Sequence, residues 1–247
     1  MKFIAWKRIF LIAFLVLLPA VSAWADIPCD GVPNLVYCQP WDQTGNAYSS
    51  QNDTTGGNGH FSTVYDNFKS NFFSPFVVGV YWVGEYFNPP AQGQITAWHI
   101  EFYNDNGGQP GGLAQAYTFT GNGNETFLGN TAGFPTYLYN EDVSFFADAN
   151  TTYWIAVYPD LGFPPQWGWS SGTGGDGESY QDFFGVRTQL SVDMAFALEG
   201  SHICCGVPEP GTLVMVGTGV VSTGVLGTDV FGLSLLGLIG AIRRRLL

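Results

Sequence analysis

Apolar and polar residues alternate with a period of two in several stretches of the chain, a pattern typical of half-buried β-strands. The clearest stretch is 190–198, whose alternate positions form one apolar face made of Leu190, Val192, Met194, Phe196 and Leu198. A similar face is formed by Thr96, Trp98, Ile100 and Phe102, opposite Ile95, Ala97, His99 and Glu101. A third face, within 75–86, is shared by Val78, Val80 and Trp82. Residues 114–120 and 151–158 are two further predicted strands.

Clusters rich in Gly, Asn, Asp and Ser separate these stretches, as tight turns require. They occur at 104–108, 121–124 and 171–177. No window between residues 26 and 206 combines a helical period of apolar residues with capping residues. About eight to ten short strands at this spacing predict an all-β fold, an antiparallel jelly-roll-like β-sandwich.

The first 25 residues have the three parts of a signal peptide. Lys2, Lys7 and Arg8 supply the positive charge, and 9–21 is an apolar run interrupted by Pro19. The small-x-small pattern Ala23-Trp24-Ala25 then precedes Asp26, where we expect the mature chain to begin. The alternative, an N-terminal membrane anchor, is disfavoured because the apolar run is short for a bilayer and a cleavage pattern follows it.

The C-terminal 207–247 also has three parts in a fixed order. The short motif Val207-Pro208-Glu209-Pro210 precedes an apolar, Gly-rich segment, which stops at Arg243-Arg244-Arg245. About 20 apolar residues span a bilayer as a helix, and arginines stay on the cytoplasmic side, so we predict a C-terminal transmembrane helix with the preceding domain outside. Because Asp229 interrupts the segment, the span either starts near Leu213 or is centred on 231–242.

This tail resembles the PEP-CTERM sorting signal that exosortases read in Gram-negative bacteria producing exopolysaccharide. The resemblance implies an exosortase-type processing enzyme as a partner. It also implies a stay in the inner membrane through the C-terminal helix, followed by release to the cell surface or extracellular matrix. The alternative is an ordinary single-pass anchor that is never cleaved.

Within residues 26–206, much of 65–197 also resembles uncharacterised β-sandwich domains of PEP-CTERM proteins. The matching pieces lie at 65–68, 80–84, 102–111 and 152–155, and the first of them reads Tyr65-Asp66-Asn67-Phe68. This resemblance implies a fold and supplies no activity.

Charge is distributed unevenly along the chain. Six of the 8 basic residues lie in the two terminal segments, which leaves Lys69 and Arg187 between them. Residues 26–199 contain 18 carboxylates against these 2 cations, a formal charge of 2 − 18 = −16. Such a domain repels phosphate backbones, so we exclude nucleic acid as a partner.

Four cysteines in an exported chain favour disulfides over free thiols. Cys29 and Cys38 enclose a short loop and can form a local bond. In the competing arrangement one of them bonds to Cys204 or Cys205, which closes a much longer loop. A zinc site built from these cysteines and His202 matches no finger spacing, so we expect no metal and no cofactor.

The candidates for catalysis are few, because the chain has 3 histidines and none lies in a known local motif. His99 and Glu101 share one face of a predicted strand, which allows an acid-base pair or an ordinary pair of polar neighbours. Gly-x-Ser-x-Gly, His-Glu-x-x-His and phosphate-binding Gly loops are all missing from the sequence. We therefore expect the protein not to be an enzyme.

Two features suggest binding instead. Trp167 and Trp169 follow a Pro-rich turn and, with Tyr180, would form a carbohydrate-stacking surface if exposed. The alternative is that they fill the core, where Trp is commonly found. Oxygen-rich turns at 105–106 and 176–178 could ligate calcium, although Asp and Asn also serve turns for backbone reasons.

These observations predict an exported surface or matrix protein, sorted through its tail and associated with exopolysaccharide. The alternative function is a carbohydrate-binding module displayed at the cell surface.

Overall fold

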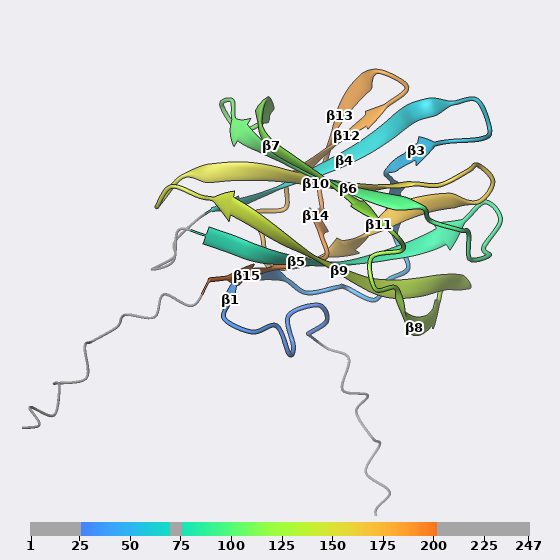
Figure 1. Ribbon diagram of the computed structural model, residues 1–247, viewed down its shortest axis with the longest axis horizontal. Coiled ribbons are helices and arrows are strands. Elements are labelled where there is room, and N and C mark those ends of the chain that lie inside the picture. The colour runs from blue at the N-terminus through green and yellow to red at the C-terminus, as the bar shows by residue number, and fades with distance from the viewer. Residues whose placement is uncertain (1–25, 70–75, 202–247) are drawn as a thin grey trace, which may run out of the picture. The chain divides into compact units, whose positions relative to one another are not determined.

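The computed structural model describes residues 26–69 and 76–201, in which every regular element is a β-strand (Figure 1). The described residues all belong to one compact unit. The predicted signal peptide, transmembrane helix and sorting motif lie outside the described residues. Within 26–69 and 76–201, no helix has the length and apolar character needed to cross a membrane.

The described part contains fifteen strands. They are β1 (Leu35–Gln39), β2 (Ala47–Ser49), β3 (Gln51–Asp53), β4 (Gly59–Lys69), β5 (Phe76–Phe87), β6 (Ala97–Asp105), β7 (Pro110–Thr120), β8 (Thr126–Thr131), β9 (Phe134–Phe146), β10 (Thr152–Asp160), β11 (Gln166–Gly172), β12 (Ser179–Phe183), β13 (Val186–Leu190), β14 (Asp193–Met194) and β15 (Phe196–Gly200).

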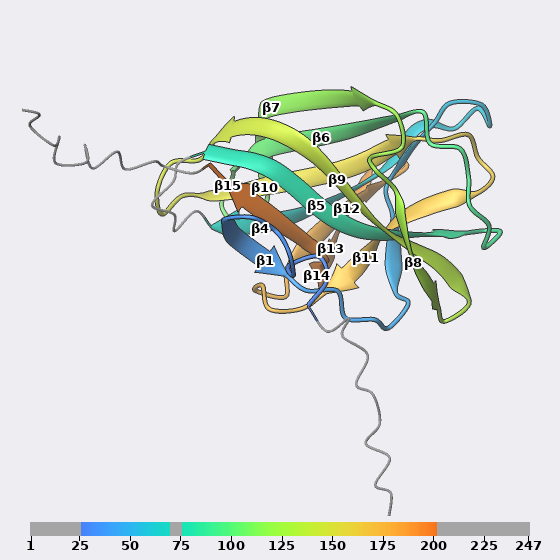
Figure 2. The same ribbon diagram turned by 60° about the horizontal axis from the view of Figure 1, so that its bottom comes forward.

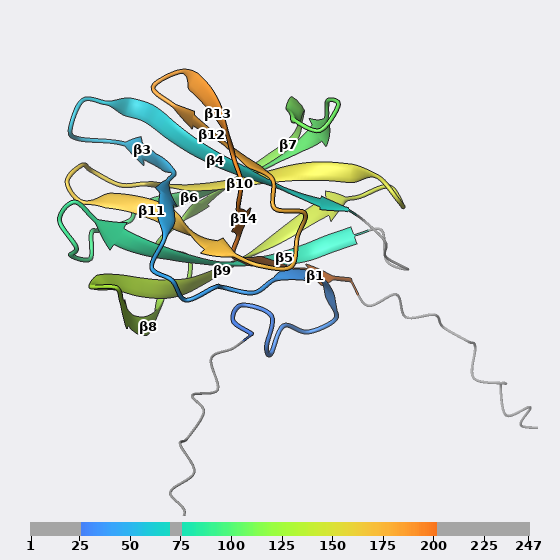
Figure 3. The ribbon, with the colours of Figure 1, turned by 180° about the vertical axis from the view of Figure 1, so that it is seen from behind.

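The strands form two sheets, as predicted for a β-sandwich. The first runs in the order β1-β15-β5-β11-β14, with β2 paired to β11, β9 paired to β5, and β8 paired to β9. The second runs β13-β12-β4-β3-β10-β6-β7, and β4 also pairs with β10. Figure 2 shows β1, β15, β5 and β9 side by side, and Figure 3 shows the second sheet from behind as a separate layer. The pairings between the described strands are antiparallel, with one exception. Strands β3 and β10 meet in parallel through one pair of residues.

Aromatic side chains from both sheets fill the space between the layers. Trp82 and Tyr139 of the first sheet stack on each other with ring centroids 5.7 Å apart. Trp98 of the second sheet meets each of them at 4.8 Å, and Trp167 lies 4.9 Å from Trp98. Edge-to-face pairs of this kind add stabilisation beyond the area that the rings bury.

The stretch 190–198 keeps its predicted face but is not one strand. Its alternate residues all contact the main core. The chain, however, leaves the second sheet after Leu190, makes the two-residue strand β14, and continues as β15 in the first sheet. Both sheets turn their apolar faces to the same interior, so the alternation survives the crossing.

The face predicted for Val78 is wrong, because β5 contains a bulge. The pairing of β5 with β9 changes register between Val77 and Gly79. One extra residue reverses the side-chain direction on either side of it. Val77 therefore shares the buried face with Val80 and Trp82. The other three predicted strands are confirmed as β6, β7 and β10.

Candidate functional site

Trp167 and Trp169 form no exposed stacking surface, so that interpretation of the pair is wrong. Both lie in strand β11 rather than in a loop, and both are fully buried. Trp167 Nε1 donates to the Tyr139 hydroxyl at 3.2 Å, and Trp169 Nε1 donates to the Ala195 carbonyl at 2.9 Å. Residues two apart in a strand point the same way, and here that direction is the core.

Tyr180 is not brought together with these tryptophans. It lies on β12 in the second sheet, buried in a small cluster with Tyr65, Trp154 and Ala156. This cluster lies outside the main core, on the outer side of the second sheet, with Tyr103 packed against it. The outer side of this sheet therefore carries a second group of aromatic rings.

The same outer side holds a ladder of three rings from neighbouring strands. His99 of β6 and Tyr158 of β10 are register partners, and their ring centroids stack 4.7 Å apart. His60 at the start of β4 stacks on Tyr158 at 4.2 Å. Tyr158 is thus enclosed between two imidazoles, and the ladder places two of the chain's 3 histidines together.

Hydrogen bonds assign His99 and Glu101 to different partners. His99 Nε2 lies 3.0 Å from Asp160 Oδ1, and its Nδ1 lies 3.2 Å from the Thr118 hydroxyl. Glu101 instead accepts from the Tyr158 hydroxyl at 2.9 Å and from the Tyr103 hydroxyl. Glu101 accepts hydrogen bonds from two tyrosines and none from His99 among these contacts. His99 and Glu101 are therefore the polar neighbours that were the alternative to an acid-base pair.

A shallow hollow of about 270 Å³ opens beside the ladder, between β4 and the β12–β13 hairpin. It is lined by His60, Phe61, Ser62, Thr63, Tyr65, Asp182 and Gly185. His60 Nε2 lies 2.6 Å from the Thr63 hydroxyl, and burial keeps the pKa of His60 below its ordinary value. Burial thus favours the neutral form of the imidazole.

Asp182 is the charged group of this hollow. Arg187 donates to both of its carboxylate oxygens at 2.7 Å, and the Tyr65 hydroxyl donates at 3.2 Å. The hydrogen bonds from Arg187 lower the pKa of Asp182, while burial opposes them. A fixed carboxylate, an imidazole and hydroxyl groups suit this hollow to hydrogen bonding with a polar ligand.

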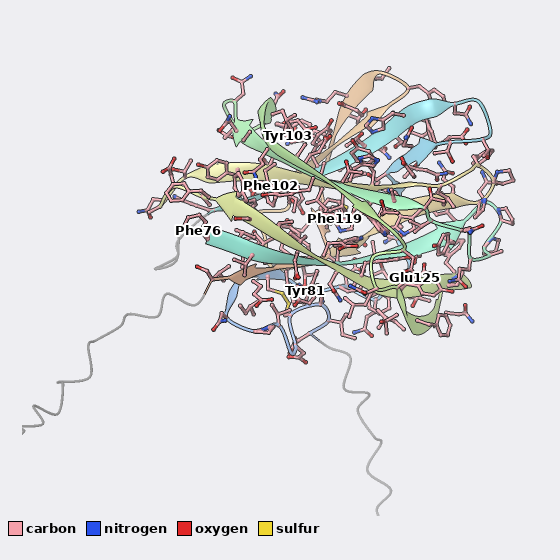
Figure 4. The ribbon with its side chains drawn as sticks, in the orientation of Figure 1. Phe76, Tyr81, Phe102, Tyr103, Phe119 and Glu125 are labelled. Atoms are coloured by element: carbon pink, nitrogen blue, oxygen red, sulfur yellow. A yellow bond between two sulfur atoms is a disulfide. The ribbon has the colours of Figure 1, made fainter. Side chains whose placement is uncertain are left out.

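A second hollow, of about 450 Å³, lies at one end of the sandwich. It is lined by Gln92, Gly93, Gln94, Ile95, Asn122 and Glu125. Glu125 Oε1 accepts from the hydroxyls of Tyr86 at 2.6 Å and Tyr139 at 2.9 Å, and its Oε2 accepts from Gln92 at 2.6 Å. Figure 4 labels Glu125 beside β8 and β9 and Tyr103 beside β7, so the carboxylate lies away from the outer aromatic cluster.

Asp66 of β4 ties several segments together. Its oxygens accept from the backbone N–H groups of Asn67 and Met194. The Gln39 amide, in the orientation that satisfies its neighbours, donates to Asp66 Oδ2 at 2.7 Å and to the Met194 carbonyl at 2.6 Å. Burial raises the pKa of Asp66 well above its ordinary value. This carboxyl therefore has a structural role at the junction of β4, β1 and β14.

The two oxygen-rich turns use their carboxylates for the fold. Asp105 Oδ1 accepts from Trp154 Nε1 at 2.9 Å, and Asp176 accepts from Asn67 Nδ2 at 2.8 Å and from the Glu178 backbone N–H at 3.0 Å. Across 26–69 and 76–201, no group of three or more His, Cys, Asp and Glu side chains is arranged to hold a metal ion. The bond from the Glu178 N–H to Asp176 is of the backbone kind that was the alternative to calcium binding.

Cys29 and Cys38 form a disulfide, with Cα atoms 5.7 Å apart. The predicted local bond is confirmed, and the arrangement that pairs either residue with Cys204 or Cys205 is wrong. Cys204 and Cys205 lie outside the described residues. The loop belongs to an N-terminal segment that covers the outer side of the first sheet. Trp41 N donates to the Ile27 carbonyl at 2.6 Å, and the Trp41 ring packs with Val83 and Ala195.

The two hollows and the exposed phenylalanines of the β12–β13 hairpin were not predicted from the sequence. The Glu125 hollow has no signal in the sequence, because Gln92 and Glu125 lie in separate loops. The β12–β13 hairpin does have a signal in the sequence, since Gly185 follows Phe184 between two short polar stretches. Comparisons with protein-family models, with curated proteins and with solved structures give no match for this chain.

Proposed function

We propose that the chain is an exported, non-enzymatic surface or matrix protein, sorted through residues 207–247 and associated with exopolysaccharide. The observation that carries this proposal is the order of a Pro-Glu-Pro motif, an apolar segment and three arginines after an all-strand domain. That order leaves the domain outside the membrane and supplies a site for a processing enzyme.

The environment of the titratable groups supports a non-enzymatic role. His99, Glu101 and Asp182 each have hydrogen-bond partners that hold neighbouring strands or a hairpin together. A nucleophile within hydrogen-bonding reach of a base is the usual sign of covalent catalysis. The hydroxyl that contacts His60 is that of Thr63, a residue that is 4% exposed and so offers little surface to a substrate.

Protein isolated from the producing cells tests the sorting proposal. Mass spectrometry is expected to find an N-terminus at Asp26 and a C-terminus upstream of Leu247. Alanine at Pro208, Glu209 and Pro210 together should leave the tail intact, whereas Ser222→Ala is the matched control and should be processed normally. A wild-type chain ending at Leu247 would contradict processing and favour the ordinary membrane anchor.

A displayed carbohydrate-binding module is the second candidate function. Trp167 and Trp169 are unable to serve it, because neither ring reaches the surface. The aromatic groups that favour it are instead Phe183 and Phe184, which are exposed on the β12–β13 hairpin.

A further inference from the structure

The tip of the β12–β13 hairpin is apolar and exposed. Phe184 is 60% exposed, Phe183 is 41% exposed, and Val186 on the same turn is 64% exposed. Phe61 of β4 lies beneath them, with ring centroids 5.3 Å from Phe184 and 6.0 Å from Phe183. Three phenylalanine rings therefore gather at one edge of the His60–Asp182 hollow, which Phe61 also lines.

The backbone at this tip is unfavourable for the residue that occupies it. Phe184 has φ of 48° and Gly185 has φ of 78°, so both central residues of the turn are left-handed. Asn or Gly is strongly preferred at the first of these positions, and a bulky side chain there costs about 1 kcal/mol. The Phe184 N–H donates to the Phe61 carbonyl at 2.7 Å, which fixes the tip against β4. An exposed ring held at such a cost is better explained by binding than by stability.

The hollow beside the tip supplies the polar half of a glycan site. Asp182 is held in place by Arg187, and the imidazole of His60 lies nearby on the lining. Sugars present apolar ring faces, which stack on aromatic side chains, and hydroxyl groups, which bond to carboxylates and imidazoles. Exposed rings and fixed polar groups lie next to each other here.

Charge limits which glycans this site would accept. The domain carries 18 carboxylates against 2 cations, and Arg187 is already paired with Asp182. A polyuronate or a sulfated chain would meet repulsion without an unpaired cation in the hollow. The same charge disfavours an anionic lipid surface and a second copy of the chain as occupants.

We propose that Phe183, Phe184 and the adjoining hollow of His60, Tyr65 and Asp182 bind a neutral polysaccharide. This inference rests on the proposed association with exopolysaccharide, and it names the site and the ligand class. The rings stack on sugar faces, and the carboxylate and imidazole select hydroxyl-bearing, uncharged chains.

The test uses the full chain, purified in a detergent without sugar head groups. Its affinity is measured on immobilised neutral polysaccharides (a β-glucan, a mannan and a galactan) and on one polyuronate. The wild type is expected to bind at least one neutral chain and to bind the polyuronate at least tenfold more weakly. Equal binding to the polyuronate, or no binding to any neutral chain, would overturn the proposal.

Phe184→Asn separates binding from folding. Asn tolerates the left-handed conformation, so the melting temperature should stay the same or rise, while affinity for the neutral chain falls at least tenfold. The matched control is Phe127→Asn, which removes a ring that is 56% exposed on β8 beside Tyr137. This control should leave affinity unchanged. Equal losses in both variants would show nonspecific hydrophobic adsorption and contradict the site.

Light scattering and the termini of the exported protein distinguish the remaining outcomes. If Phe184→Asn converts a dimer to a monomer and leaves glycan affinity unchanged, the tip is a self-association surface and the proposal fails. If binding depends on Phe184 but the tail is never processed, the site stands and the sorting proposal fails. If the tail is processed and Phe184→Asn binds like the wild type, the sorting proposal stands and the proposed binding site fails.

Discussion

Arg187 faces Asp182 across the β12–β13 hairpin and donates to both carboxylate oxygens, from Nε and Nη2, at 2.7 Å each. The same guanidinium lies 5.1 Å from the centroid of the Tyr65 ring, and its Nη1 donates to the Pro110 carbonyl at 3.1 Å. One side chain thus links β13 to β12, β4 and the start of β7. This arrangement needs the planar, forked donor of arginine.

Arg187→Lys is expected to lower the free energy of unfolding by about 1 kcal/mol, because lysine replaces a two-pronged contact by a point charge in a partly exposed pair. The loss should largely disappear when Asp182 is already Asn.

The contribution of the Arg187–Asp182 pair should also depend on pH. The pKa of Asp182 is lowered in the folded protein, so the stabilisation is present above its ordinary pKa and is lost as pH falls through the folded value. Urea denaturation at neutral and acidic pH measures both effects. Lys69→Ala, at an exposed strand end, is the control and should change little.

Gly84→Ala should destabilise the protein by about 3 kcal/mol or prevent its folding. A Cβ at this position would overlap the six-membered ring of Trp167 and lie 2.8 Å from the Gly168 carbonyl oxygen. Both neighbours are buried in the paired strand β11, so neither can move aside cheaply. Gly112→Ala in β7 is the control, since nothing lies within 4 Å of its added carbon. A chemical melt in which the two variants are equally stable would contradict the packing of Trp167 against Gly84.

Glu85→Gln tests a buried carboxyl on the outer side of the first sheet. Burial raises the pKa of Glu85 to about 7, the Thr136 hydroxyl acts to lower it, and the nearby Asp42 adds to the rise. The folded state therefore binds more protons than the unfolded state between the ordinary glutamate pKa of 4.5 and about 7. Stability should fall as pH rises through that window and then level off.

Glutamine removes this cost of ionisation and keeps a polar group near Thr136. The variant should match the wild type near pH 4 and exceed it by on the order of 3 kcal/mol at pH 8. Unfolding curves at several pH values give the difference in free energy of unfolding between the variant and the wild type. The raised pKa of Asp66 affects both proteins equally, so its contribution cancels in this difference. Glu178→Gln, at an exposed turn, should follow the wild-type profile. A constant offset between Glu85→Gln and the wild type at all pH values would be inconsistent with a titrating Glu85.

The predictable strands are those with one face in the core and one face half exposed. In β6, Trp98, Ile100 and Phe102 alternate with His99 and Glu101, and the pattern was sufficient. In β4 the alternation pattern was not sufficient to predict the strand, because polar residues such as Ser62, Asp66 and Asn67 are buried along with the apolar ones. Their hydrogen bonds cross to other segments, and a period of two contains no information about such partners.

The predicted binding residues failed for a related reason. Trp167 and Trp169 show the spacing of one strand face, but spacing alone does not say whether that face is inside. The exposed rings lie at Phe183 and Phe184, in a turn where the residue before Gly185 must be left-handed. Whether such a tip meets solvent or another segment depends on the placement of β4, which is set by pairing far along the chain.

Cys29→Ser together with Cys38→Ser should lower the free energy of unfolding by about 2–3 kcal/mol, the loop-closure contribution expected for a ring of this length. The disulfide closes residues 29–38, directly before Trp41 packs on the first sheet. Loss of the bond should therefore expose the N-terminal segment first, detectable as faster proteolysis and hydrogen exchange there than in β5 or β10. Single replacement of Cys204 by Ser is the matched control and should leave the exchange of this segment unchanged. Non-reducing peptide mapping that pairs Cys29 with Cys204 or Cys205, instead of with Cys38, would contradict the structure directly.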